Sequence, residues 1–86
     1  MKIEFEKHKG ELDIETNEVI FYDLTFSGIL KAIEFLKGIP PRNTYAPWYY
    51  RGHKGLIDEA DGSVYIRDRW FPDEEFAKEI IKTGYK

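Results

Sequence analysis

The sequence contains no cysteine, a single methionine and two histidines among its 86 residues. The lack of cysteine excludes a disulfide framework, a thiolate nucleophile and a cysteine-based zinc site, and it leads us to expect a reducing, cytoplasmic setting. No run approaches the roughly 20 apolar residues that a membrane-spanning helix needs. Residues 1–10 alternate charged and bulky side chains, so neither a signal peptide nor membrane association is predicted.

The motifs of common enzyme classes are missing as well. The chain has no phosphate-binding loop, no dinucleotide fingerprint and no nucleophile elbow. An acidic turn at residues 58–61 resembles a calcium loop only faintly, because its first ligand position would be Ile57. No metal, cofactor or catalytic residue is therefore predicted, and we expect a non-enzymatic protein.

The two histidines are the remaining candidates for acid–base chemistry, because only they titrate near neutral pH when unperturbed. His8 lies between two lysines in a predicted hairpin connection, where we expect it to be exposed. His53 has a glycine on its N-terminal side and another two residues later. A histidine-based ribonuclease fits poorly with a net charge of −3, because such a protein repels RNA. A small hydrolase that uses His53 is the third-ranked hypothesis.

Fourteen aromatic residues and 42% apolar residues indicate a folded protein. No linker or low-complexity tract divides the chain, and no internal repeat is predicted. At this length one modest hydrophobic core is the expected limit. Residues 1–86 are therefore expected to form one small domain.

The first half shows the period of β-structure followed by that of a helix. Strict alternation predicts strands at residues 2–6 and 11–15, joined by a hairpin connection at residues 7–10, and a short β-branched run predicts a third strand at 19–22. Apolar residues at helical spacing predict a helix over residues 26–37, with Thr25 or Ser27 as N-cap and Gly38 just after its end. Phe35 falls opposite the apolar face.

The second half begins with a loop at residues 39–47. Residues 48–51 are expected to be extended, and a turn ending at Gly62 is predicted to join strands at 53–58 and 63–69. Asp73 is the predicted N-cap of a second helix that has Lys82 in its last turn and ends at Gly84. The order β-β-β-α-β-β-α predicts an α+β protein: a mostly antiparallel sheet of about five strands with two helices packed on one face.

Residues 45–54 (YAPWYYRGHK) are the strongest candidate for a binding surface. Tryptophan, tyrosine and arginine dominate binding hot spots, because they bury a large area at low entropic cost. If the last hairpin is half-buried, one of its rows extends this surface. The predicted contact residues are Tyr45, Trp48, Tyr49, Arg51, His53, Tyr65, Arg67 and Arg69. The alternative is that these rings close the hydrophobic core.

An acidic surface is predicted at the other end of the chain. Residues 3–23 carry seven acids and two lysines, a local charge of −5. The predicted acidic face consists of Glu4, Glu6, Glu11, Asp13 and Glu15. Such a face fits a basic partner. It is also what the solvated side of an ordinary antiparallel sheet looks like.

These features predict a small protein-interaction module that binds a protein partner. Its size and acidity are similar to those of immunity proteins, antitoxins and phage-encoded inhibitors. Single-stranded nucleic-acid binding through the same aromatic and basic side chains is the alternative. An edge strand, or Phe35 if it is exposed, would also support a homodimer.

Overall fold

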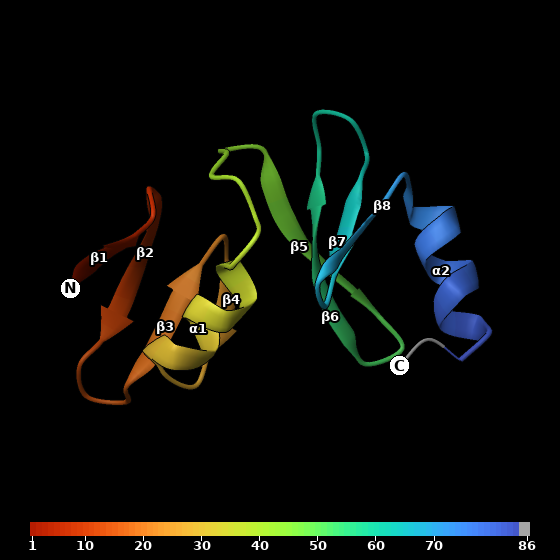
Figure 1. Ribbon diagram of the computed structural model, residues 1–86. Coiled ribbons are helices and arrows are strands. Elements are labelled where there is room, and N and C mark those ends of the chain that lie inside the picture. Colours follow the sequence, from red (N-terminus) through yellow and green to blue (C-terminus); the bar gives the residue numbers. More distant parts are fainter. Residues whose placement is uncertain (85–86) are drawn as a thin grey trace. The chain divides into compact units, whose positions relative to one another are not determined.

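The computed structural model describes residues 1–84, and the chain divides into two compact units with the boundary between Asn43 and Thr44 (Figure 1). Each unit has its own four-stranded antiparallel sheet and one helix. The predicted α+β class is confirmed. One shared sheet of about five strands was predicted, and two separate sheets of four strands are observed.

The first unit is an antiparallel meander followed by a helix. Its strands β1 (Lys2–Phe5), β2 (His8–Asp13), β3 (Glu18–Phe21) and β4 (Leu24–Phe26) are neighbours in chain order, and α1 (Ile29–Leu36) packs on β3 and β4. Alternation along each strand sends apolar side chains to one side of the sheet. The buried residues of this unit include Val19, Phe21, Leu24, Phe26, Ala32 and Leu36. The opposite side, named here the helix-free face, is largely polar.

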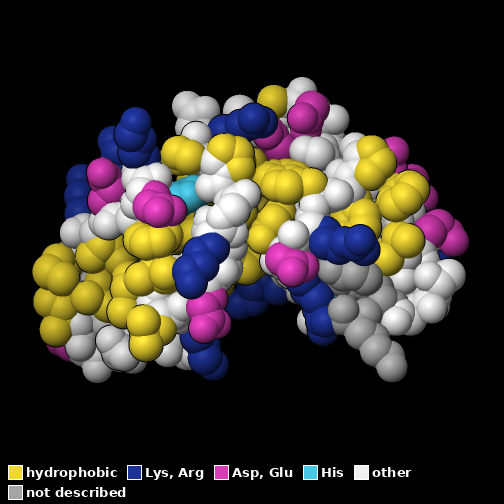
Figure 2. All heavy atoms as spheres, viewed as in Figure 1, with side chains coloured by type: hydrophobic (Ala, Val, Ile, Leu, Met, Phe, Trp, Pro, Cys, Tyr) yellow, Lys and Arg dark blue, Asp and Glu magenta, His cyan; other side chains and the backbone are white. Residues whose placement is uncertain are grey.

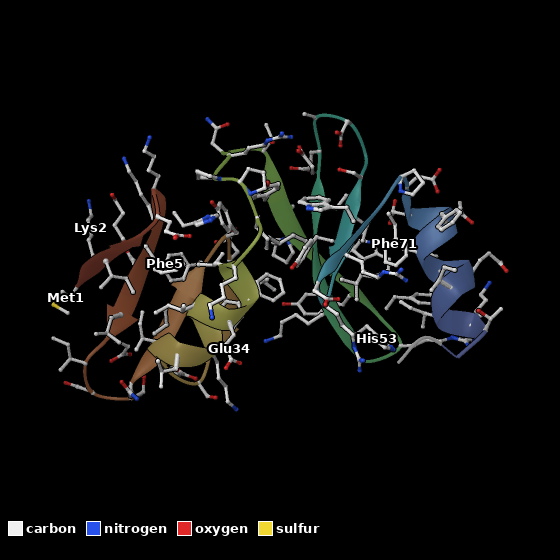
Figure 3. All side chains as sticks on the ribbon, viewed as in Figure 1. Met1, Lys2, Phe5, Glu34, His53 and Phe71 are labelled. Carbon is white, nitrogen blue, oxygen red and sulfur yellow. The ribbon has the colours of Figure 1, made fainter. Side chains whose placement is uncertain are left out.

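The second unit has the same order of elements. Strands β5 (Tyr45–Tyr50), β6 (His53–Asp58), β7 (Val64–Ile66) and β8 (Arg69–Phe71) are neighbours in chain order, and α2 (Glu74–Lys82) packs on β7 and β8. Phe71 points from β8 toward α2 (Figure 3). The core cluster consists of Trp48, Val64, Ile66, Phe71, Ala77 and Ile81. No helix within residues 1–84 is long and apolar enough to cross a membrane.

In the first unit, three local predictions are wrong. Residues 7–10 were expected to be a connection, but β2 already begins at His8, because Glu6 and Lys7 adopt positive φ angles of 47° and 71° and close a two-residue turn. Phe26 lies in β4 and not in the helix. The helix begins later, at Ile29, with Gly28 as an N-cap that lacks a side-chain hydrogen bond.

In the second unit, the local turn and capping signals are confirmed. Gly62 has a φ angle of 82°, and the Asp73 carboxylate accepts a hydrogen bond from the backbone N–H of Phe76 at 2.8 Å. The strand predicted at residues 63–69 is instead interrupted by a turn at Arg67, whose φ angle is 61°, and the chain returns as β8. Pro47 is tolerated within β5 because that strand lies at the edge of its sheet.

The two units form a tandem repeat, so the prediction of no internal repeat is wrong. Shifting the sequence by 45 positions places β2 on β6 and β4 on β8, residue for residue. Ten of the 39 residue pairs aligned between 1–39 and 46–84 are identical. They are His8/His53, Lys9/Lys54, Gly10/Gly55, Asp13/Asp58, Val19/Val64, Asp23/Asp68, Phe26/Phe71, Ala32/Ala77, Glu34/Glu79 and Lys37/Lys82. These identities are scattered among pairs that differ, both buried and exposed, so no local pattern in the sequence reveals the repeat.

One repeated pair explains how the strands can approach so closely. A Cβ atom built on Gly10 would lie 2.5 Å from the carbonyl oxygen of Ile20 on β3. A Cβ atom built on Gly55 would collide with the carbonyl oxygen of Tyr65, the residue equivalent to Ile20. Only glycine fits at this place in either sheet.

Replacing either glycine by alanine is therefore expected to destabilise the protein. Gly10→Ala and Gly55→Ala should each lower the free energy of unfolding by about 1–3 kcal/mol, because the backbone must move to admit the methyl group. Urea titration followed by circular dichroism measures the change, and Lys9→Ala, at an exposed neighbouring position, is the control. Glycine variants as stable as this control would contradict the close approach.

Candidate interaction surface

The predicted aromatic surface is divided between core and solvent. Tyr45, Trp48 and Tyr65 are only 8%, 6% and 3% exposed, so their assignment as contact residues is corrected. The side chain of Trp48 belongs to the core under α2, and its indole Nε1 donates to the Oε1 atom of Glu74 at 2.9 Å. Trp70 has its ring centroid 6.0 Å from that of Tyr45 and 5.1 Å from that of Tyr65.

The exposed part of the prediction gathers at one end of the second sheet. Tyr49 pairs directly with Lys54, and Gly55 pairs with Ile66, so the β5–β6 and β7–β8 turns lie at the same end. We name this region the cationic end; it consists of Tyr49, Arg51, Lys54, Arg67 and Arg69, all of which are exposed, and its β7–β8 turn also carries the exposed acid Asp68. Tyr49 has 62% of its surface exposed.

Local contacts fix this end of the sheet. The guanidinium carbon of Arg51 lies 5.5 Å from the centroid of the Tyr50 ring, and Lys78 of α2 approaches the same ring at 5.6 Å. His53 pairs with Tyr50 and is partly buried. The contact set predicted from sequence omitted Lys54, although alternation along β6 places it on the same side of the sheet as Tyr49.

The second unit is electrically polarised along its strands. The β6–β7 turn, at the opposite end from the cationic end, carries Glu59 and Asp61, and buried Asp58 precedes it. The Asp58 carboxylate accepts hydrogen bonds from the hydroxyl of Thr44 at 2.6 Å and from the backbone N–H of Ala60 at 3.0 Å. The small net charge of the chain therefore hides a local concentration of positive charge.

The predicted acidic face is not uniformly negative. In the sheet register, Lys2 lies opposite Glu11 and Glu4 lies opposite Lys9, so each glutamate on these two strands faces a lysine. The carboxylate of Asp13 accepts hydrogen bonds from two backbone N–H groups of the β2–β3 turn. The remaining two predicted residues, Glu6 and Glu15, lie in turns.

His8 is a structural residue and not an exposed one, since only 1% of its surface is accessible. Its Nε2 atom lies 2.8 Å from the carbonyl oxygen of Ile39, and its Nδ1 atom lies 2.6 Å from the hydroxyl of Tyr22. Because a carbonyl oxygen only accepts, Nε2 donates to Ile39, and Nδ1 forms the second hydrogen bond with the Tyr22 hydroxyl. At the positions equivalent to Tyr22 and Ile39 the second unit has Arg67 and Gly84.

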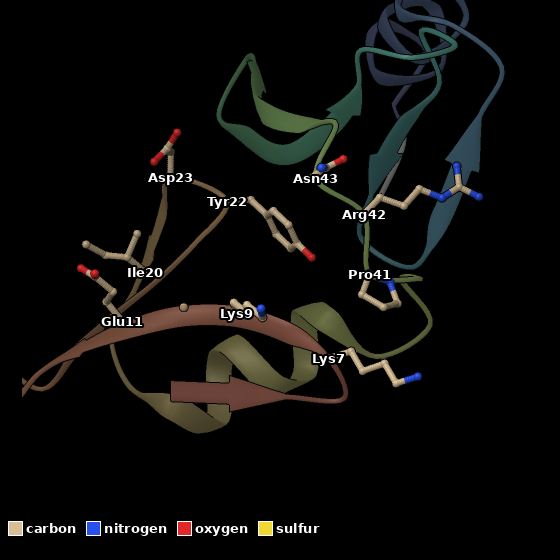
Figure 4. A pocket seen from close by; sticks show the side chains of 10 residues that line it. Lys7, Lys9, Glu11, Ile20, Tyr22, Asp23, Pro41, Arg42 and Asn43 are labelled. Carbon is tan, nitrogen blue, oxygen red and sulfur yellow. The ribbon is translucent and has the colours of Figure 1, made fainter. Parts of the chain in front are cut away.

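Burial raises the pKa of the Tyr22 phenol, and a hydrogen bond from the backbone of Arg42 offsets part of that rise. The ring lies beside a hollow of about 810 Å³ in the first unit and extends toward the segment around Arg42 (Figure 4). Cations line this hollow together with Glu11 and Asp23. The mixed charge favours no particular class of ligand, and residues 1–84 hold no cluster of histidine and carboxylate groups suited to a metal ion.

No protein-family model, curated protein or solved structure matches the chain. The surfaces described above are therefore the basis on which a function is assigned.

Because the pKa of Tyr22 is raised, we expect this residue to affect how the stability of the folded state changes at alkaline pH. Burial favours the neutral phenol of Tyr22 in the folded state. The stability that Tyr22 contributes is therefore fully present below its pKa in the unfolded state, about 10, and is lost as pH rises through its higher pKa in the folded state. Tyr22→Phe should unfold more easily at neutral pH, since it removes the hydroxyl bonded to His8, yet lose less stability above pH 10 than the unmodified protein. Thermal unfolding across this range measures both effects. Parallel alkaline losses in the two proteins would contradict the assignment.

Proposed function

We propose that this chain is a non-enzymatic binding module that uses its cationic end to contact an acidic surface on a protein partner. The observation that carries the proposal is the gathering of one exposed tyrosine ring and four exposed cations at one end of the second sheet. Opposite potentials on two proteins steer their association and select the correct partner.

The proposal is supported by preorganisation, because the β5–β6 hairpin holds the contact side chains in place before a partner binds. Tyr49 and Lys54 are held by paired strands, and Arg51 is placed by a two-residue turn in which Gly52 has a φ angle of 82°. Side chains on such a rigid hairpin lose less conformational entropy on binding than the same residues on a free loop. A large aromatic ring beside arginines is the composition typical of energetic hot spots.

A narrower proposal is that binding inhibits the partner, as in proteins of the immunity or phage-inhibitor type. Small size and negative net charge support it. The lack of cysteine supports placing this activity in a reducing cytoplasm.

Substitutions at the cationic end should weaken capture of the partner. We expect the tagged chain to enrich a protein from its native host, and Tyr49→Ala combined with Arg51→Glu to reduce that enrichment about tenfold or more. Quantitative mass spectrometry measures the recovery. Both side chains are exposed, so the variant should keep its melting temperature.

The matched control is Lys37→Glu, which reverses one exposed charge just after α1 in the first unit. It should recover the partner like the unmodified chain. A contact at the cationic end would be contradicted if the Tyr49/Arg51 variant recovered as much partner as the unmodified chain. It would also be contradicted if the Lys37→Glu control lost as much partner as that variant.

Single-stranded nucleic acid is the second candidate. The observation that favours it is the direct pairing of Tyr49 with Lys54 on the sheet side opposite α2, which sets a ring for base stacking beside a cation for phosphate.

This candidate predicts binding of fluorescent oligo-dT or oligo-U that weakens steeply between about 50 and about 200 mM salt. Tyr49→Ala should cost about 1–3 kcal/mol of binding free energy and Tyr49→Phe much less, because phenylalanine keeps the stacking ring. Fluorescence anisotropy measures both effects. Equal losses from the two substitutions would contradict base stacking.

A further inference from the structure

Apolar side chains gather at the end of the first unit where the β2–β3 turn meets the start of α1. Ile14, Ile29 and Leu30 have 72%, 39% and 74% of their surfaces exposed, and we name these three residues the apolar patch. A Cβ atom on Gly28 would lie 3.9 Å from the amide nitrogen of Asn17, which shows that the turn and the helix start are adjacent. Hydrophobic side chains are visible over this end of the unit (Figure 2).

The tandem repeat shows that the fold does not need these residues. At the positions of Ile14, Ile29 and Leu30, the second unit has Glu59, Glu74 and Glu75, all exposed. The two glutamates in the first turn of α2 complement the positive end of the helix dipole. Helix α1 has no acidic residue in its first turn and no side-chain cap. At the start of its helix the first unit thus lacks the stabilising acidic groups of the second unit and exposes apolar side chains instead.

Charge around the patch is mainly negative. Asp13 and Glu15 flank Ile14 in sequence, Glu18 follows in the same turn region, and Lys31 is the one cation in residues 13–18 and 28–31. The turn holds its acids in place: Asp13 accepts from the backbone N–H of Glu15 at 3.0 Å, and the Thr16 hydroxyl donates to Glu18 at 3.3 Å. An apolar centre with an acidic rim is complementary to an apolar segment flanked by cations.

We infer that the apolar patch is a docking surface for a basic amphipathic helix of a protein partner, whose leucine-type side chains cover the patch while its lysines or arginines meet the acidic rim. The inference rests on the proposed function as a protein-binding module and adds a second contact surface to it. A second copy of this chain would bring two acidic rims together, and an anionic membrane would be repelled by the rim.

The probe for this surface is a synthetic helical peptide of roughly 14 residues, or four turns, with leucine on one face and lysine on the other. A peptide with glutamate in place of lysine is the charge control. We expect the intact chain to bind the lysine peptide and to bind the glutamate peptide at least about tenfold more weakly. Isothermal titration calorimetry measures both affinities.

Variants that copy the second unit test the patch itself. Ile14→Glu with Leu30→Glu should weaken binding of the lysine peptide about tenfold or more while the melting temperature is unchanged. Ile20→Glu, at a residue 40% exposed on the helix-free face, is the matched control and should bind normally. Glu15→Lys with Glu18→Lys should weaken binding of the lysine peptide and strengthen binding of the glutamate peptide.

The inference would be overturned by no binding of the lysine peptide, equal binding of both peptides, an equal loss of binding with Ile20→Glu, or tighter binding to phosphatidylserine vesicles. Concentration-dependent dimerisation that Leu30→Glu removes would assign the patch to a second copy and also overturn it. Arg51→Glu should leave peptide binding unchanged. An experiment that disproves partner binding at the cationic end can therefore be told apart from one that disproves peptide binding at the apolar patch.

Discussion

The close contact of two strand backbones, at the glycine of each repeat, is the constraint on which the rest of the structure depends. Where β2 passes β3, and again where β6 passes β7, a carbonyl oxygen occupies the space that a side chain would need. Gly10 and Gly55 therefore fix the register of these strand pairs. Register in turn decides which side chains face the helix, because a one-residue slip would send every side chain to the opposite face.

The repeat shows which residues the two units share and which differ. Identical pairs include the glycines, the aspartates that begin the β2–β3 and β6–β7 turns, and small or apolar residues under each helix. The same framework carries different surfaces, since three apolar residues at one end of the first unit are glutamates in the second. The structure thus supplies its own internal comparison. A residue that differs between the units, and that neither sheet needs, is a candidate for binding.

Sequence signals correctly predicted those features that depend only on residues close together in the chain. Asp73 caps its helix and Gly62 takes the left-handed conformation, as predicted, because each role depends on neighbouring backbone groups. Two strands were missed because β4 and β8 have only three residues each, too few to show a period. His8 was misplaced because its partners, Tyr22 and Ile39, are distant in sequence.

The sequence by itself determined the α+β class, the strand alternation, the turn glycines and the concentration of aromatic and cationic residues between positions 45 and 69. These follow from side-chain period and backbone preference, which are local properties of the chain. Only the tertiary structure decided that Trp48 and Tyr65 are buried while Tyr49 is exposed, and that two lysines lie opposite the glutamates of the first hairpin. Alternation places residues on two faces, but packing and register, which join distant segments, decide which face is covered.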